Sequence, residues 1–147
     1  MNNSSSINKL FGGMRIAATG LNAERARIDT IARNVANAET TRMPGTNEPY
    51  RRQAVHFAPI MERMANGQQM IGGVEVTEIA PDHSTMFEEI HDPSHPDADP
   101  RGYVKMPNVN TMKEMADLIT AVRAYEANLS VQENFVRMAE RALRLAE

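Results

Sequence analysis

The sequence predicts a mainly α fold in which long N- and C-terminal helices pair as an antiparallel coiled coil. Apolar or small residues in the stretch 7–38 recur in alternating steps of four and three, which is the spacing of a coiled-coil seam. A matching pattern begins at Met115, and the middle of the chain is polar and rich in proline. Each apolar stripe is too narrow to keep its helix folded alone in water, so each helix needs a partner. We therefore expect the two ends of the chain to meet.

Each seam is interrupted by one polar residue. If the helix ends are matched, Leu21 faces Gln132 and Glu24 faces Leu129, which puts the two polar residues in layers about 5 Å apart. We expect Glu24 and Gln132 to share a polar contact that sets the register. The N-terminal seam consists of Leu10, Met14, Ala17, Leu21, Ile28, Ile31, Val35 and Ala38, and the C-terminal seam of Met115, Leu118, Val122, Tyr125, Leu129, Val136, Ala139, Leu143 and Ala146.

Further apolar residues lie beside the predicted seams. In a lone pair of helices they would face water, which is an unfavourable arrangement unless another helix covers them. We expect them to pack on helices of neighbouring subunits, with Phe135 as the largest contact and with the free chain only partly helical. They are Ile16, Ile119, Val131, Phe135, Met138 and Leu145.

Three glycines interrupt the N-terminal helix, and each costs about 1 kcal/mol relative to alanine. Gly12, Gly13 and Gly20 allow another helix to approach the backbone closely. Alternatively, the helix bends there, or it begins only near Met14.

The middle of the chain predicts a β-hairpin followed by an extended strap. Residues 50–57 and 73–79 read as strands, with Ala65-Asn66-Gly67 as a turn. A two-stranded hairpin is marginal alone and needs a surface to pack on. The segment 81–110 holds five prolines and little periodicity, so we expect a polyproline-like strap that contacts neighbouring subunits more than its own helices. Thr111 and Glu114 form a capping-box pattern that opens the last helix.

These elements predict three segments: 1–40 and 111–147 as the two coiled-coil helices, and 41–110 as the hairpin and loop region. The formal charge of −3 and pI of about 5.8 provide no basic field for nucleic acid. No stretch approaches the roughly 18 apolar residues of a membrane span, and the N-terminal residues lack the features of a secretory signal. The absence of cysteine leaves the compartment open.

The chemistry of an enzyme is not apparent in the sequence. There is no phosphate-binding glycine loop, no nucleophile motif and no carboxylate in a setting that would tune it. Arg51-Arg52 suits a phosphate but is also typical of an exposed strand face. The metal-ligand types that gather in the proline-rich segment lack the spacing of a known site, so we expect neither metal nor cofactor: His83, His91, Asp92, His95, Asp97 and Asp99.

Asparagines inside the helices carry more information. Asn34 and Asn37 flank Ala36 near the end of the first helix, and asparagine is unfavourable in a helix interior. They either cap a fraying helix end or bond backbone groups of a neighbouring element at a packed junction. Asn128 is open to the same two interpretations.

Several segments are similar to those of a known family. The chain resembles the bacterial flagellar rod and hook proteins, and within them the proximal-rod proteins, in order over nearly its whole length. One departure is Arg33, where many axial proteins carry a second asparagine, so only Asn34 and Asn37 match. The segments are 32–40 (ARNVANAET), 49–53 (PYRRQ), 73–76 (GVEV), 96–99 (PDAD), 102–109 (GYVKMPNV) with Glu114-Met115, and 123–128 (RAYEAN).

The resemblance implies a non-enzymatic structural subunit of the flagellar basal-body rod, a homo-oligomer within a periplasm-spanning drive-shaft. It implies proximal and distal rod subunits and the small protein joining the rod to the MS ring as partners. It also implies export by the flagellar type III apparatus without a cleaved signal peptide, and no direct membrane insertion. The alternative is a soluble helical-hairpin adaptor that binds one partner through a Met-rich face.

Residues from the helices, the hairpin and the loops are expected to form the assembly interface. They are Leu10, Met14, Leu21, Ile28, Ile31, Asn34, Val35, Asn37, Tyr50, Tyr103, Pro107, Asn108, Met115, Leu118, Val122, Tyr125, Asn128, Leu129, Phe135, Val136 and Leu143.

Overall fold

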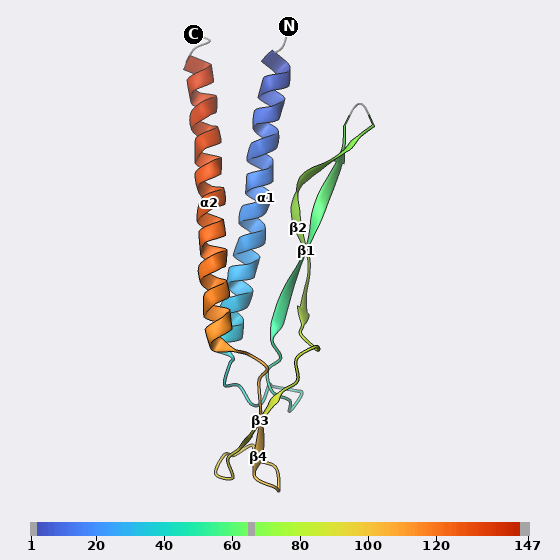
Figure 1. Cartoon of the computed structure of the whole chain (residues 1–147), viewed down its shortest axis with the longest axis vertical. Helices are drawn as coiled ribbons and strands as arrows, with labels where there is room; N and C mark the ends of the chain where they lie inside the picture. Colours follow the sequence, from blue (N-terminus) through green and yellow to red (C-terminus); the bar gives the residue numbers. More distant parts are fainter. Residues whose placement is uncertain (1–2, 65–66, 145–147) are drawn as a thin grey trace.

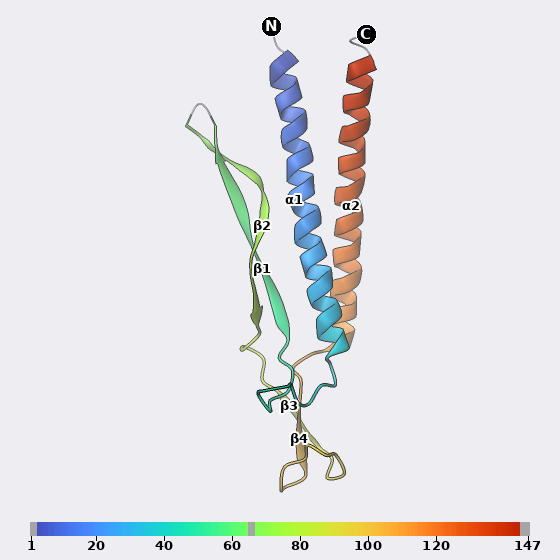
Figure 2. The same ribbon diagram turned by 180° about the vertical axis from the view of Figure 1, so that it is seen from behind.

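Two long helices dominate the molecule. The computed structural model describes the backbone of residues 3–64 and 67–144, and the side chains within those ranges from residue 11 onward. Helix α1 spans Asn3–Ala36 and helix α2 spans Thr111–Arg144. They lie side by side and antiparallel, with the two ends of the chain at the same end of the molecule (Figures 1 and 2). Because they flank two β-hairpins, the chain is mixed α and β. The sequence had predicted a mainly α fold.

The first hairpin packs along α1 on the side away from α2 (Figure 1). Strand β1 (Gln53–Arg63) pairs antiparallel with β2 (Gln69–Pro81), so both strands are longer than predicted. The Thr19 hydroxyl on α1 accepts a hydrogen bond from the Val74 N–H at 3.2 Å, and Arg15 pairs with Glu62 at 2.6 Å. A Cβ at Gly73 would collide with Thr19, so glycine permits this close contact. Helix α1 is thus the surface that the hairpin needed.

The hairpin is bent by two shifts in register, after His56 and after Ile60. Such bulges increase the twist of a two-stranded ribbon and let it follow a helix. At its tip, the Met64 N–H donates to the Gln68 carbonyl and the Gly67 N–H donates to the Met64 carbonyl. Gly67 has a left-handed φ of 82°, as a tight turn requires. The other two residues of the predicted turn, 65 and 66, lie outside the described residues.

The predicted strap is instead a second small hairpin, so that expectation was wrong. Strand β3 (Glu88–His91) pairs antiparallel with β4 (Tyr103–Met106), and tight turns fill the proline-rich stretch between them. Aspartates build these turns: the Asp92 carboxylate accepts bonds from Ser94, and the Asp99 carboxylate accepts bonds from the Arg101 and Tyr103 N–H groups. Local side-chain bonds of this kind favour turns over extended polyproline backbone.

Helix α2 begins with a different cap from the predicted one. The Asn110 side chain accepts a hydrogen bond from the Lys113 N–H at 3.0 Å, and the Asn110 carbonyl accepts the first helical bond, from Glu114. Asn110 is therefore the N-cap residue. Glu114 cannot close a capping box because its carboxylate is engaged elsewhere, as described below.

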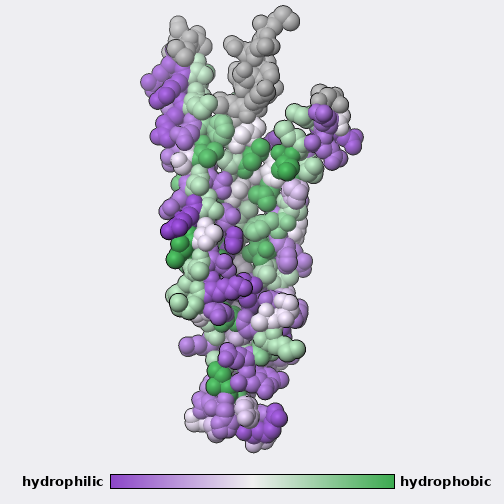
Figure 3. All heavy atoms as spheres, in the orientation of Figure 1, coloured by the Kyte–Doolittle hydropathy of each residue, from purple (hydrophilic) through white to green (hydrophobic). Residues whose placement is uncertain are grey.

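The apolar core is thin. Apart from Ile31, Tyr50, Val104 and two prolines, the buried apolar residues among those described are alanines: Ala17, Ala23 and Ala121. Larger apolar side chains remain on the surface of the helices and the hairpin, where patches are visible in Figure 3. Among the described residues, neither helix is long and apolar enough to cross a membrane. The chain alone leaves much apolar surface in water.

Candidate functional site

A buried polar junction joins the end of α1, the start of α2 and the start of β1. The Asn34 amide donates to the Glu114 carboxylate at 2.9 Å, and Arg52 Nε donates to the other oxygen of Glu114 at 2.7 Å. Glu114 is fully buried and Asn34 is 1% exposed. Both carboxylate oxygens therefore have partners, as a buried charge requires.

Every polar atom of the Asn34 side chain is used at this junction. Its amide nitrogen also donates to the Gln53 carbonyl, and its oxygen accepts from the Gln53 N–H and from the Tyr50 hydroxyl, all at 2.9 Å. Burial raises the pKa of the Tyr50 hydroxyl, which therefore stays protonated and able to donate. Asn34 thus bonds the backbone of a neighbouring element, which confirms the packed-junction interpretation for this residue.

Asn108 extends the junction toward the second hairpin. Its side-chain oxygen accepts from the Arg52 N–H at 2.8 Å, and its amide donates to the carbonyls of Asp82 and Thr85, both at 3.0 Å. Hydrogen bonds from Ser84 lower the pKa of Asp82 to about 2, with a further contribution from Thr85. Arg52 also lies 3.8 Å from this carboxylate. One asparagine thereby ties together three loop segments.

Asn37 behaves differently. Its side-chain amide donates to the Arg33 carbonyl within the same helix end at 2.9 Å. It therefore caps its own helix, and the junction interpretation was wrong for this residue. Arg51 and Arg52 are also internally engaged: Arg52 at the junction, and Arg51 over the ring of Phe87 with 4.1 Å from guanidinium carbon to ring centroid.

The contact between α1 and α2 follows small and polar residues. The Phe135 ring fills the space over Gly13, and Asn128 lies against Gly20, where a Cβ would come within 3.0 Å of its amide. Glu114 and the fully buried Ala121 continue this line at the same seven-residue spacing. The glycines therefore do permit close approach, and α1 continues without a break from Asn3. Gly12, in contrast, faces open space.

The predicted register was wrong. It placed Leu21 opposite Gln132, whereas its neighbour Gly20 lies against Asn128. The two helices are thus displaced by more than one helical turn from the expected alignment. The Glu24–Gln132 contact does not form, and Glu24 Oε2 has no hydrogen-bond partner among the described residues. The Asn34–Glu114 bond aligns the helices instead.

The actual contact positions also precede predicted seam positions by one residue on both helices, which leaves much of the predicted seam open. In antiparallel helices, residues that directly follow the seam positions lie on the same side of the pair. We call this side the open face. It consists of Met14, Leu21, Ile28 and Val35 of α1, which are half-buried, and Met115, Val122, Leu129, Val136 and Leu143 of α2, which are exposed.

The additional apolar residues have mixed outcomes. Ile16, Ile119, Val131 and Met138 are exposed, as expected for residues beside the seam. Phe135 is half-buried, because its ring packs on Gly13 of its own chain, and its role as the main contact with a neighbour stays a prediction. Leu145 lies outside the described residues.

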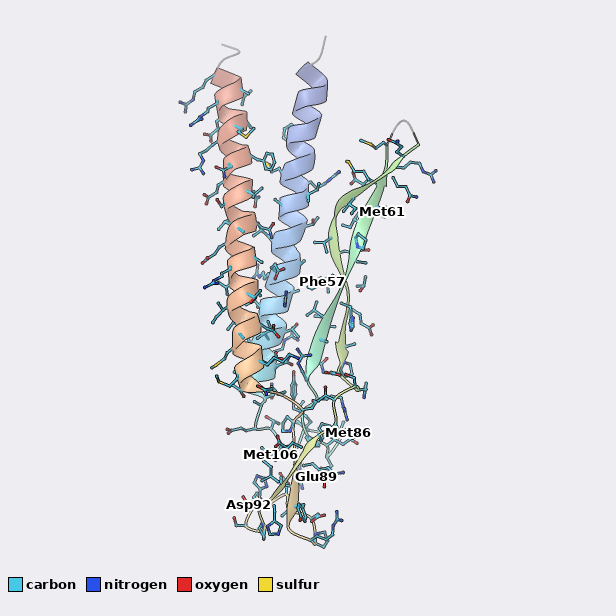
Figure 4. All side chains as sticks on the ribbon, in the orientation of Figure 1. Phe57, Met61, Met86, Glu89, Asp92 and Met106 are labelled. Carbon is cyan, nitrogen blue, oxygen red and sulfur yellow. The ribbon has the colours of Figure 1, made fainter. Side chains whose placement is uncertain are left out.

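The remaining predicted interface residues are distributed over the helix seam and the second hairpin. Ile31 is buried, and Leu118 and Tyr125 are half-buried along α2. Tyr103 is exposed on β4 and packs edge-on against His91, with ring centroids 5.0 Å apart, and Pro107 is buried beside Asn108. The Leu10 side chain lies outside those that are described. Figure 4 shows other exposed side chains: Met61 on the first hairpin, Met86 just before the second hairpin, and Glu89 on its strand β3.

Sequence reasoning missed Glu114 and Arg52 as partners across the junction. The available signal was a carboxylate at the start of α2 and an arginine directly before β1. Spacing alone does not reveal a pairing between residues so distant in the chain. Within the described residues, no group of three acidic or histidine side chains is placed to hold a metal ion.

Comparison with known proteins identifies the family. Residues 14–42 match the model "Flagella basal body rod protein", and residues 101–145 match "Flagellar basal body rod FlgEFG protein C-terminal". The chain is 42% identical to the flagellar basal-body rod protein FlgC of Borreliella burgdorferi, over 94% of this chain and 98% of the relative. This chain belongs to the FlgC family of flagellar basal-body rod proteins.

Other FlgC relatives support the assignment. The Bacillus subtilis protein is 36% identical over 93% of this chain and 98% of its own length. The Salmonella typhimurium protein is 34% identical over 90% and 94%. The two family matches together include Asn34, Glu114 and most of both helices, so the rod-protein similarity covers the residues that align α1 with α2.

Proposed function

We propose that this chain is a structural subunit of the proximal rod of the bacterial flagellum, which self-assembles through its terminal helices into the tubular drive-shaft that transmits torque. It belongs to a family of rod structural proteins, which argues against an enzymatic role. The observation that carries the proposal is the open face, an apolar surface along both helices whose α2 residues are exposed and whose α1 residues are half-buried in the single chain.

The open face suits assembly because its area is distributed along a rod-like pair of helices. Leu129 is 41% exposed and Leu143 is 71% exposed. Contiguous apolar surface of this kind marks protein interaction sites. A contact between two different surfaces of successive subunits leaves a free surface at each end, so assembly does not stop at a dimer. Such contacts build a filament when they do not close into a ring.

Within this proposal, α1 and α2 form an antiparallel coiled coil and act as the axial part of the subunit, in segments 1–40 and 111–147. The intervening segment 41–110 reaches toward adjacent subunits. Its second hairpin contacts neighbours more than its own helices. The interface includes the open face together with Tyr50, Tyr103, Pro107 and Asn108, which position the hairpins.

The proposed partners are further copies of the chain, other proximal and distal rod subunits, and the small protein that joins the rod to the MS ring. The subunit reaches the periplasm-spanning rod through the flagellar type III export apparatus without a cleaved signal peptide. It does not insert in a membrane or bind nucleic acid.

The test is complementation of a strain that lacks the gene. We expect the wild-type chain to restore swimming and to be recovered in purified basal bodies. Leu129→Asp places a charge on the open face and should abolish both. Ser130→Asp adds the same charge at the adjacent exposed residue, which points away from the helix seam, and should be tolerated better.

Recovery of the chain as a free, well-folded monomer, with rods complete in its absence, would instead favour the soluble adaptor. Size-exclusion chromatography of the purified chain separates the two: a rod subunit self-associates or remains partly folded, whereas an adaptor elutes as a folded monomer or dimer.

A further inference from the structure

A row of three exposed glutamates borders the open face on α2. Each lies four residues after one apolar residue of that face and three residues before the next, so its side chain neighbours both. None of the three has a hydrogen bond or an ion pair among the described residues. The row consists of Glu126, Glu133 and Glu140, and we call it the glutamate row.

The arginines of this part of α2 lie farther from the open face than the glutamate row does. Arg137 and Arg144 each follow a glutamate by four residues, and Arg123 precedes one by three, which turns them a further 40–60° or so around the helix. Arg137 donates to Asn134 of its own helix at 2.9 Å. A helix that covers the apolar residues therefore meets the glutamates before it meets the arginines.

Helix α1 borders the same face with the opposite charge. Arg25 lies four residues after Leu21 and three before Ile28, which is the placement that each glutamate has on α2. It is exposed and forms no hydrogen bond or ion pair within the described part of the chain. The positions seven residues to either side of it are Ala18 and Ala32, so Arg25 is the single charge in its row.

Arg25 and the glutamate row cannot meet within one chain. Gly20 and Asn128 touch where α1 packs on α2. Arg25 follows Gly20 by five residues, and Glu133 follows Asn128 by five, which turns each charged side chain about 140° away from this contact. The two charges therefore point outward from opposite edges of the helix pair.

We propose that the α2 edge of the open face receives the α1 edge of a second copy of this chain, with Arg25 of the second copy paired to the glutamate row. The inference rests on the proposed rod function and names the partner of one surface. The chain itself carries the two complementary surfaces, each an apolar line bordered at the same helical position by charges of opposite sign. Copies joined in this way stand side by side, and each keeps one edge free for the next.

The apolar residues restrict the alignment of the two copies. Copies that stand side by side in the same orientation place α1 of one antiparallel to α2 of the other. Two alignments then match all four apolar residues of α1 with apolar residues of α2. In the first, Ile28 packs on Val122 and Arg25 meets Glu126. In the second, one heptad along α2, Arg25 meets Glu133.

The charges also exclude a competing arrangement. Two α2 edges packed on each other would cover the same apolar residues but would set one glutamate row against another, which like charges disfavour. Charged residues that flank an apolar seam select partners and orientation in coiled coils in this way. Arg25 is therefore a specificity residue between copies, whereas Asn34 and Glu114 align the helices inside one chain.

Cross-linking in intact basal bodies tests the contact. The chain has no cysteine, so Ala32→Cys marks the α1 edge and Val122→Cys marks the α2 edge. A strain that makes the two variants as separate chains should yield a cross-linked dimer of this chain when treated with a short bis-maleimide. Strains that make either variant alone are the controls and should yield none, because the contact joins two different edges. Rods that contain both variants but give no dimer, or cross-links only to other rod proteins, would overturn the inference.

Charge reversal in the same mixed strain tests the role of Arg25. Arg25→Glu should remove most of the dimer, and so should Glu126→Lys combined with Glu133→Lys, because each change sets like charges against each other. All three changes together should restore the dimer, and Arg25→Lys, which keeps the charge, should retain it. A dimer yield indifferent to these changes would contradict the pairing. Recovery of the chain in purified basal bodies keeps these outcomes distinct from failure of the proposed function, in which the wild-type chain itself is missing from them.

Discussion

Asn34 shows how one residue can connect three parts of the fold. Its side chain bonds Glu114 at the start of α2 and both backbone groups of Gln53 at the start of β1. A primary amide has two donors and one acceptor oxygen in a single plane, so it matches a backbone N–H and C=O pair and a carboxylate at once. Aspartate lacks the donors, and leucine lacks both groups.

Replacing Asn34 with alanine should destabilise the fold strongly. The change leaves Glu114, the Tyr50 hydroxyl and the Gln53 backbone with unsatisfied buried groups, and we expect a loss of about 3 kcal/mol in the free energy of unfolding. Asn37→Ala is the matched control from the same sequence motif. Because the Asn37 side chain bonds only nearby groups, the Arg33 carbonyl and the Thr40 hydroxyl, its loss should be within about 0.5 kcal/mol.

Urea titration of the helix signal measures both values. Equal losses for the two variants would contradict the distinction between a junction residue and a capping residue.

Asp82 makes the loop after β2 sensitive to acid. Hydrogen bonds from Ser84 and Thr85 lower its pKa from 3.8 to about 2, so its ionised form stabilises the folded loop. This stabilisation is fully present above the ordinary pKa and is lost as the pH falls through about 2. The amide NMR signals of Ser84 and Thr85 should therefore titrate near pH 2 and lose that step in Asp82→Asn. A midpoint at the ordinary value would contradict the hydrogen-bonded loop.

At this scale the sequence predicted residue types better than partners. Asn34 was recognisable because asparagine is unfavourable inside a helix, and that signal is local. Its partners lie far along the chain, so only the folded structure shows that Glu114 bonds Asn34 and Arg52 rather than closing a capping box.

The element scale concerns how α1 approaches α2. Gly13→Ala increases helix propensity by about 1 kcal/mol but places a methyl group against the Phe135 ring. Gly12→Ala brings the same gain at a position facing open space. We expect the Gly12 variant to be more stable than wild type, and the Gly13 variant to be less stable than the Gly12 variant by about 1–3 kcal/mol.

Thermal unfolding followed by circular dichroism makes this comparison. Phe135→Leu should reduce the difference between the two glycine variants by removing the ring. If the two variants melt together, the close contact between Gly13 and Phe135 is not made.

The misassigned seam has a physical cause. Apolar periodicity identifies which side of a helix avoids water, but it does not say whether a helix of the same chain or of another subunit covers that side. Here the glycines and Ala121 form the internal contact, since small residues let the helices approach closely. The larger residues remain on the open face. The long proline-rich segment was misread for a related reason, because its aspartates build turns that composition alone does not distinguish from extended chain.

At the scale of the whole molecule, the structure divides its contacts between two purposes. Polar bonds at the base and small residues along the seam hold one chain together, and larger apolar residues remain exposed on the open face, where we propose that other chains cover them. The two long terminal helices, the first hairpin and the structural role could all be predicted from the sequence. The division was not, because it depends on the relative alignment of two helices separated by more than seventy residues.

The most direct test is the accessibility of Leu129 in the assembled rod. The chain contains no cysteine, so Leu129→Cys supplies a unique thiol on the open face. A maleimide reagent should label this thiol readily in the free chain. In intact basal bodies the label should be excluded, and dissociation of the rods should restore labelling. Equal labelling of the free chain and of intact basal bodies would contradict the claim that neighbouring helices cover the open face.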